Sequence, residues 1–145
     1  MKYTVIIDDS RDEEVVVYLR EPRAIAEKIE KIVLSESCEL IGYGDNQIFR
    51  LSKEDIYSVY VENGCLFAST EYGRLRLRER LYTVEQMMSE DFLKINQSCI
   101  VSIDRIERFD VTPGGALTVI MKNGYKDYVS RRQMKAVKER LGIKR

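Results

Sequence analysis

From Cys38 onward, short apolar segments are separated by turn residues, a pattern typical of β-strands, and apolar and polar residues alternate strictly with a period of two in Arg74-Leu75-Arg76-Leu77-Arg78. Segments 56–61 and 65–70 are joined by Glu62-Asn63-Gly64, an Asn-Gly signal for a tight hairpin. A second Asn-Gly pair separates 116–121 from 125–129. Further short strands are expected at 39–43, 47–51, 74–78, 93–95, 100–102 and 106–109. The pattern therefore predicts a mainly β (α+β) protein.

Short helices are expected between these strands. Ser52 is placed to cap a single helical turn at 52–55. Thr83-Val84-Glu85-Gln86 has the spacing of a capping box, which predicts a helix that starts at Thr83 and ends near Glu90.

The last helix is predicted to start at Ser130, because Ser130-Arg131-Arg132-Gln133 repeats the capping-box spacing. Gly142 is placed to end it. One side of this helix is apolar and is formed by Met134, Val137 and Leu141. Arg131 and Arg132 then lie in the first turn and point away from the packed side.

Residues 1–40 are predicted to form a separate strand-strand-helix unit. Apolar segments at 2–7 and 12–19 flank an acidic run that we interpret as an exposed hairpin connection. Glu21-Pro22 opens the helix, since proline in a first turn loses no hydrogen bond. The apolar stripe of this helix consists of Ile25, Ile29, Ile32 and Val33. Two strands alone are marginal, so the stripe needs the hairpin, the domain at 41–145 or a second subunit. We expect dimerisation, with intramolecular packing as the alternative.

The net charge of the chain is zero, but the charge is unevenly distributed. Residues 1–44 contain six Lys/Arg and ten Asp/Glu, a net charge of −4, whereas residues 45–145 contain eighteen and fourteen, a net charge of +4. Residues 122–145 alone have nine basic and two acidic residues. Local charge decides whether a surface can neutralise phosphates. The C-terminal part therefore favours a polyanionic partner, although Lys144 and Arg145 are interpreted as residues that solvate the helix end.

Several function classes are excluded by composition. The chain contains no histidine, so His-based catalysis and ordinary zinc sites cannot be built. No glycine-rich phosphate loop is found, and the three cysteines show no metal-ligand spacing. No apolar run approaches the ~20 residues of a membrane span, and no signal peptide is recognised. We expect a cytoplasmic protein that is not an enzyme, with no catalytic residue, metal, cofactor or small-molecule substrate.

Two short apolar segments run directly into clusters of amide or guanidinium side chains, namely Phe92-Leu93-Lys94-Ile95-Asn96-Gln97-Ser98 and Val129-Ser130-Arg131-Arg132. These side chains can form two hydrogen bonds at once to a purine edge. Arg131 suits guanine, and Gln97 or Asn96 suits adenine. Contacts to phosphates set the register of the protein on the duplex without reading sequence. The residues suited to such contacts are Lys94, Ser98, Arg132 and Lys135.

Each assignment has a structural alternative. Asn96 could cap its own loop through the backbone, and Arg131 could pair with a carboxylate such as Asp127. A cation at a helix N-terminus is locally unfavourable, which favours a ligand for Arg131. One face of the 74–78 strand is interpreted as a solvated sheet surface and not as a DNA groove contact. That face carries Arg74, Arg76 and Arg78.

Residues 41–143 resemble the LytTR-type DNA-binding domain of bacterial transcription regulators. The resemblance rests on four blocks with matching spacing: Phe92-Leu93-Lys94-Ile95-Asn96-Gln97-Ser98, Ile100-Val101-Ser102 with Ile106 following, Lys122-Asn123-Gly124, and Val129-Ser130-Arg131-Arg132. It implies an elongated arrangement of about ten strands in small antiparallel sheets with short helices. The strand-strand-helix unit resembles that of short, receiver-less members, which are commonly encoded beside a small membrane protein.

The resemblance also implies a docking mode, in which loops instead of a recognition helix enter successive major grooves and the DNA bends. Carried onto this chain, the base contacts fall at Gln97 and its neighbour Asn96, at Arg131, and at Asn63 in the 62–64 turn. Family members often carry His-Asn or His-Arg where this chain has Asn96-Gln97, and a basic or histidine residue near Asn63.

The sequence therefore predicts a sequence-specific, double-stranded DNA-binding transcription regulator that acts as a homodimer on repeated sites. The alternative is a protein-interaction module that partners a membrane protein. An RNA-binding module has less support, because the loops lack aromatic residues for base stacking. The DNA-binding prediction requires the turns around 97 and 131 to emerge side by side on one cationic edge.

Overall fold

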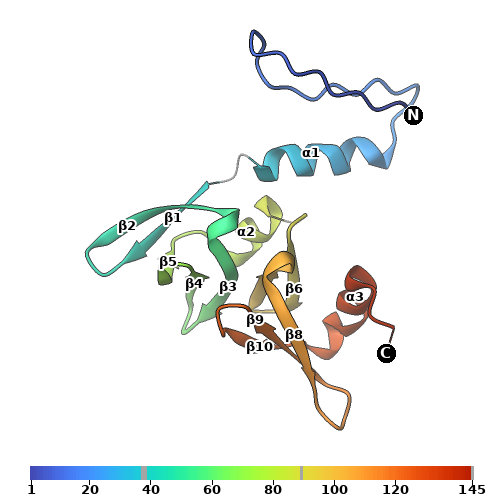
Figure 1. Ribbon diagram of the computed structural model, residues 1–145. Helices are drawn as coiled ribbons and strands as arrows, with labels where there is room; N and C mark the ends of the chain where they lie inside the picture. Colours follow the sequence, from blue (N-terminus) through green and yellow to red (C-terminus); the bar gives the residue numbers. More distant parts are fainter. Residues whose placement is uncertain (37–38, 89, 145) are drawn as a thin grey trace.

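Figure 1 shows the computed structural model, which describes residues 1–36, 39–88 and 90–144. The strands are β1 (Glu39–Gly44), β2 (Gln47–Ser52), β3 (Ile56–Glu62), β4 (Cys65–Thr70), β5 (Gly73–Leu77), β6 (Phe92–Asn96), β7 (Cys99–Ser102), β8 (Ile106–Val111), β9 (Leu117–Met121) and β10 (Lys126–Tyr128). The helices are α1 (Ala24–Glu36), α2 (Leu81–Met87) and α3 (Arg131–Leu141), with 3-10 turns η1 (Lys53–Asp55) and η2 (Ile103–Arg105). This confirms the prediction of a mainly β fold with about ten strands.

The strands form two antiparallel sheets. A seven-stranded sheet has the order β2-β1-β5-β4-β3-β7-β6, and a three-stranded sheet has the order β10-β9-β8. Hairpins supply many of the neighbouring pairs, but β3 and β7 are far apart in sequence and pair through Val59 with Ile100 and Tyr60 with Cys99. Because this pairing is antiparallel, the turn after β3 and the turn before β7 lie at the same edge of the large sheet.

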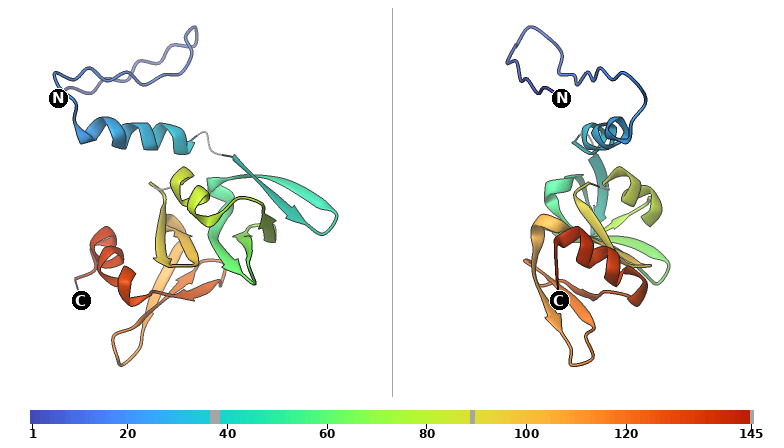
Figure 2. Two further views of the ribbon diagram at one scale, coloured as in Figure 1. Left: turned by 180° about the vertical axis from the view of Figure 1, so that it is seen from behind. Right: turned by 90° about the vertical axis from the view of Figure 1, so that its right-hand side faces the viewer.

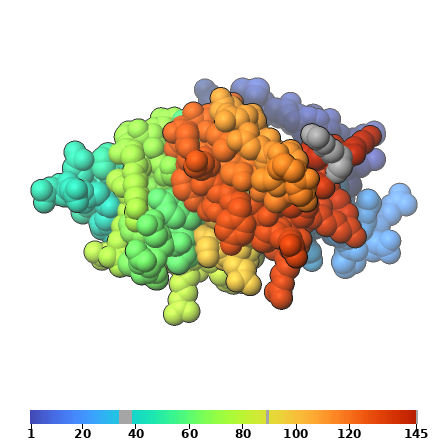
Figure 3. Space-filling view, turned by 90° about the horizontal axis from the view of Figure 1, so that it is seen from below, coloured from blue at the N-terminus to red at the C-terminus, as the bar shows by residue number. Residues whose placement is uncertain are grey.

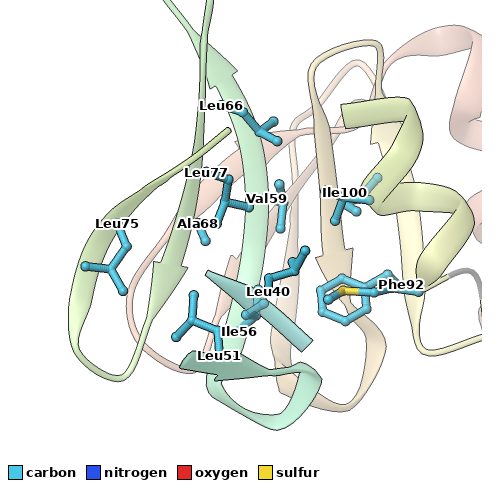
Figure 4. Close-up of a cluster of buried hydrophobic side chains, with 12 residues drawn as sticks. Leu40, Leu51, Ile56, Val59, Leu66, Ala68, Leu75, Leu77, Phe92 and Ile100 are labelled. Atoms are coloured by element: carbon cyan, nitrogen blue, oxygen red, sulfur yellow. The ribbon is translucent and has the colours of Figure 1, made fainter. Parts of the chain in front are cut away.

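One face of the seven-stranded sheet packs against α2 around a buried apolar cluster (Figure 4). Val84 lies on α2, and Met88 is the residue that follows this helix. Both side chains contribute to the cluster and are fully buried. The cluster consists of Leu40, Leu51, Ile56, Val59, Leu66, Ala68, Leu75, Leu77, Val84, Met88, Phe92 and Ile100. Leu75 and Leu77, the apolar positions of the period-two segment 74–78, thus face the interior, as expected for a strand with one buried face.

A second apolar cluster lies between β6–β7, the three-stranded sheet and α3. It consists of Leu93, Ile95, Cys99, Val101, Leu117, Val119, Met121, Val129 and Val137. Strand β7 is buried on both faces, because Ile100 belongs to the first cluster whereas Cys99 and Val101 belong to the second. The turn that precedes β7 is therefore anchored by both cores.

Helix α3 matches its prediction at both ends. The Ser130 hydroxyl accepts a hydrogen bond from the backbone N–H of Gln133 at 3.3 Å, which caps the N-terminus. Gly142 ends the helix with a left-handed φ of 70°. Val137 is fully buried, while Arg131 and Arg132 in the first turn are exposed.

Helix α2 begins two residues earlier than predicted. Its first residue is Leu81, and the backbone N–H of Val84 donates to the carbonyl oxygen of Arg80, so Thr83 lies inside the first turn and is not the cap. The helix also ends at Met87 instead of near Glu90. Burial of Val84 and packing of Leu81 against the first cluster position this helix, and these tertiary contacts override the capping-box signal.

The prediction of two N-terminal strands is wrong, since no strand is assigned within residues 1–23. Two extended segments run side by side around a turn at Asp9-Ser10, on the far side of α1 from the sheets (Figures 1 and 2). Their apolar side chains are exposed, for example Ile6 (77%) and Tyr18 (92%). Because these side chains are exposed, the two segments lack the packing that a two-stranded pair needs to be stable.

The predicted N-terminal helix is confirmed, but it begins at Ala24, so Pro22 precedes the first turn instead of lying in it. Its apolar stripe is only partly covered, since Ile25 and Ile29 are half-buried while Ile32 and Val33 are 52% and 42% exposed. Among the described residues, no helix is both long and apolar enough to cross a membrane.

Candidate nucleic-acid interface

Three polar turns lie in a row along one edge of the structure. They are the β3–β4 turn (62–64), the β6–β7 turn (97–98) and the start of α3 (130–132). The backbone N–H of Val61 donates to the carbonyl oxygen of Ser98 at 2.8 Å. The N–H of Ser130 donates to the carbonyl oxygen of Ile95 at 2.9 Å. The β6–β7 turn therefore lies between the other two, and the green, yellow and orange-red segments that contain them follow one another along the lower side of Figure 3.

The β3–β4 turn presents Asn63 to solvent. Asn63 has a φ of 52° and Gly64 a φ of 78°, as a two-residue hairpin turn with both central residues in the left-handed region requires. The space around Gly64 is open, so glycine is favoured here by the backbone conformation and not by a steric limit. The Asn63 side chain makes no hydrogen bond within the described residues and is available to a ligand.

The β6–β7 turn exposes Gln97 and Ser98 but buries Asn96, which is 1% exposed. The Asn96 amide nitrogen donates to the Asp127 carboxylate at 3.2 Å and to the Tyr128 carbonyl oxygen at 2.9 Å. Its amide oxygen accepts from the backbone N–H of Ser98 at 2.8 Å. Both polar atoms of this amide are therefore occupied, and the contacts agree with the alternative that Asn96 caps its own loop.

Asp127 joins the β6–β7 turn to the segment that leads into α3. One carboxylate oxygen accepts from Asn96 and from the backbone N–H of Tyr128 at 2.8 Å, and the other accepts from the Tyr125 hydroxyl at 2.9 Å. Tyr125 in turn lies 3.7 Å from the sulfur of Cys99. This network is half-buried, so its hydrogen bonds are only weakly screened by water. It holds the β6–β7 turn and the α3 start in a defined relative position.

Two members of this network are kept uncharged by their surroundings. Burial, followed by the interaction with Cys99, raises the pKa of the Tyr125 phenol. Burial, followed by the Asp127 charge, raises the pKa of the Cys99 thiol. Both groups are therefore protonated at neutral pH, and the Tyr125 hydroxyl can donate to Asp127.

The alternative for Arg131, an ion pair with Asp127, is not formed. No ion pair of Arg131 is found among the described residues, and the Asp127 carboxylate is occupied by the network above. Arg131 and Arg132 are exposed, and Lys135 is exposed one turn later on the same helix. The structure thus gathers exposed cations at a helix N-terminus, where the backbone itself attracts anions.

The remaining predicted contact residues are placed less uniformly. Ser98 is exposed in the β6–β7 turn, whereas Lys94 is half-buried on β6, two residues before Asn96. Sequence reasoning missed the positioning role of Asp127 and Tyr125. Asp127 lies 31 positions from Asn96 along the chain, and no periodicity in the sequence signals that they meet.

These features agree with a known family. A sequence model of that family, described as the LytTr DNA-binding domain, matches residues 46–142. The chain belongs to the LytTR family. The predicted resemblance is confirmed, and the chain carries a DNA-binding domain of transcription regulators. Residues 1–36 lie outside the matched region.

Relatives of the LytTR chain occur in Staphylococcus aureus. Proteins of strains NCTC 8325 and COL are each 34% identical over 110 residues, which cover 76% of this chain and 75% of theirs. Both are named uncharacterized HTH-type transcriptional regulators. In this LytTR chain, however, five strands separate α2 from α3 within the described residues, so these two helices do not form a helix-turn-helix.

A solved LytTr DNA-binding domain from Bacillus cereus has the same fold. It superimposes with a TM-score of 0.67 and covers 72% of this chain and 97% of that domain. The two sequences are only 14% identical, so the likeness concerns the fold. The part of this chain that superimposes therefore has the fold of a LytTr domain.

Proposed function

We propose that this protein is a sequence-specific, double-stranded DNA-binding transcription regulator that inserts its polar turns into successive major grooves. The observation that carries this proposal is the row of three turns held together by the Val61–Ser98 and Ser130–Ile95 backbone hydrogen bonds. The row spans three to four strand spacings, roughly 15–20 Å at about 4.8 Å each. A major groove is about 12 Å wide. The row is longer than this width, so the three turns cannot lie across a single groove.

Arg131, Gln97 and Asn63 are the proposed base contacts. All three are exposed, and each lies in a different turn of the row. Arg131 suits a bidentate contact to guanine and Gln97 one to adenine, each contributing about 1–3 kcal/mol of discrimination. We now assign Asn96 to positioning of the turn, because its amide is buried and fully hydrogen-bonded.

Phosphate contacts are proposed for four residues around these turns: Lys94, Ser98, Arg132 and Lys135. Arg132 and Lys135 flank the N-terminus of α3, so their charge adds to that of the helix dipole. Such contacts set the register of the protein on the duplex and contribute affinity without reading sequence.

Selection of duplexes from a random library by the full chain tests this function. We expect a defined preferred sequence, and we expect Arg131→Ala to relax the preference at a single base position while the remaining positions are still selected. A wild-type chain that enriches no sequence would contradict the proposal. An equal loss of affinity of Arg131→Ala for selected and random duplexes would contradict the base-reading role of Arg131.

We also propose that the N-terminal unit, within residues 1–40, supports homodimerisation on repeated sites. The exposed apolar side chains of residues 1–23 and of α1 support this proposal, because patches of this kind mark interaction surfaces. Sedimentation of the full chain and of a variant with charged residues at Ile32 and Val33 tests it. We expect a dimer and a monomer, respectively. A monomeric wild-type chain would favour the second candidate, in which this surface binds a membrane-protein partner.

A further inference from the structure

Strand β5 presents a row of arginines toward the edge that carries the three turns. Leu75 and Leu77 are buried in the first apolar cluster, so the residues between and beside them, Arg74, Arg76 and Arg78, face solvent, and Arg80 follows at the start of α2. Leu77 pairs with Leu66 near the start of β4. The C-terminal end of β5 therefore lies at the same edge as the β3–β4 turn, one strand beyond it.

Aromatic rings orient two of these guanidinium groups. The Arg74 guanidinium carbon lies 3.7 Å from the ring centre of Phe67, and that of Arg78 lies 4.3 Å from the ring centre of Tyr43. A guanidinium stacked on a ring keeps its N–H groups directed outward along its edge, where they can bind an oxyanion. Arg74 forms an ion pair with Glu62, in which a guanidinium nitrogen lies 3.2 Å from a carboxylate oxygen. Among the described residues, no ion pair of Arg76, Arg78 or Arg80 is found.

The three unpaired arginines line one hollow of about 620 Å³ beside the β3–β4 turn. Gly64 of that turn and Tyr43 also line it. Glu79 is the acidic residue among its lining side chains, so three arginines and one carboxylate give the hollow a net charge of +2. A concave, cationic surface next to the row of turns is complementary to a phosphate backbone.

We propose that Arg76, Arg78 and Arg80, here called the β5 arginine cluster, bind DNA backbone phosphates that flank the sequence read by the turns. This inference rests on the proposed function and extends its contact surface by one strand beyond the β3–β4 turn. Arginine suits this role because its planar group can donate two hydrogen bonds to one phosphate. The cluster contributes affinity and lengthens the protected DNA, whereas base preference stays with the turns. The alternative is that this face is only a solvated sheet surface.

The double variant Arg76→Gln/Arg78→Gln tests the proposal in the full chain. Its affinity is measured by fluorescence anisotropy against salt concentration, with a duplex selected by the wild-type protein and with a random duplex. Loss of two phosphate contacts should lower the slope of log K against log salt by about 2 and weaken binding at least about tenfold at 0.1 M salt. The loss should be equal on both duplexes. Hydroxyl-radical footprinting should show reduced protection at one flank of the selected site.

Two controls make the result specific. Arg50→Gln/Arg108→Gln removes the same charge from exposed surface ion pairs outside the cluster and should leave the footprint unchanged. Arg76→Lys/Arg78→Lys keeps the charge and should retain most of the salt slope. A glutamine variant that matches the Arg50/Arg108 control in slope and footprint would overturn the inference. A wild-type chain without salt-dependent duplex binding would overturn the proposed function as well, so the two failures are distinguishable.

Discussion

The β3–β4 hairpin and the N-terminal pair of extended segments are both predicted as two strands around a turn, yet only the first forms strands. Val59 of β3 and Ala68 of β4 are fully buried, and the hairpin is flanked by β7 and β5. In residues 1–23, by contrast, apolar side chains such as Ile6 and Tyr18 are exposed. The difference teaches that an apolar segment beside a turn forms a strand only when other elements cover its apolar face.

The largest effect is expected from a buried position of the β domain. Ile100 is fully buried on β7, the strand between β3 and β6. Ile100→Ala should therefore lower the free energy of unfolding by about 2–5 kcal/mol. The matched change Ile6→Ala, at a side chain that is 77% exposed, should change it by less than about 0.5 kcal/mol. Urea denaturation of both variants measures this contrast. Equal losses would mean that residues 1–23 pack against a partner surface.

A smaller effect is expected at the polar contacts that hold the turns. Asn96→Ala leaves the Asp127 carboxylate and the Ser98 N–H without this partner and should cost about 1–3 kcal/mol of unfolding free energy. Gln97→Ala, in the same turn but exposed, should leave stability unchanged and alter only the preferred base. Chemical denaturation and duplex selection, run on both variants, separate the two roles. A stable Asn96→Ala protein with an altered base preference would instead make Asn96 a base contact.

Cationic side chains on α3 and on α1 should differ in their effect on DNA affinity. Lys135→Ala should weaken binding to all duplexes and lower the salt slope by about 1, because Lys135 is exposed one turn from Arg131. Lys28→Ala removes the same charge from α1, on the N-terminal side of the molecule, and should not change the slope. Anisotropy titrations over a range of salt concentrations provide the measurement. A matching loss for Lys28→Ala would place α1 against the duplex.

The smallest effect is expected at the N-terminal turn. The Ser10 hydroxyl, and then its backbone N–H, donate to the Asp8 carboxylate and lower its pKa from the ordinary value. The pKa of Asp8 in Ser10→Ala should therefore rise toward the ordinary value. Because a lowered pKa stabilises only above the pH range of carboxylate titration, any contribution is lost as the pH falls through it. NMR titration of Asp8 checks the shift, and an unchanged midpoint would show that the hydroxyl is not bound.

Local signals predicted much of the β domain. Asn63-Gly64 identified a hairpin turn, and Ser130 with Gly142 marked the ends of α3, because turn and cap preferences depend on a few neighbouring residues. The start of α2 was mispredicted, since burial of Val84 and Leu81 outweighs the cap preference of Thr83. Exposure of Gln97 and Arg131 agrees with their predicted surface positions, whereas burial of Asn96 could not be read from its place in the same motif.

By itself, the amino-acid sequence determined the mainly β class, the polar character of the turns and the family, because periodicity, turn residues and motif spacing are properties of short stretches. Only the tertiary structure decided which of those turns became neighbours, which amide faces solvent and where the β5 arginines lie. These depend on the pairing of β3 with β7 and on the contact of Asn96 with Asp127, between residues some thirty to forty positions apart. Such pairings form because they bury both apolar clusters at once. The residues of each cluster come from many segments, so no single segment predicts which of them will pair.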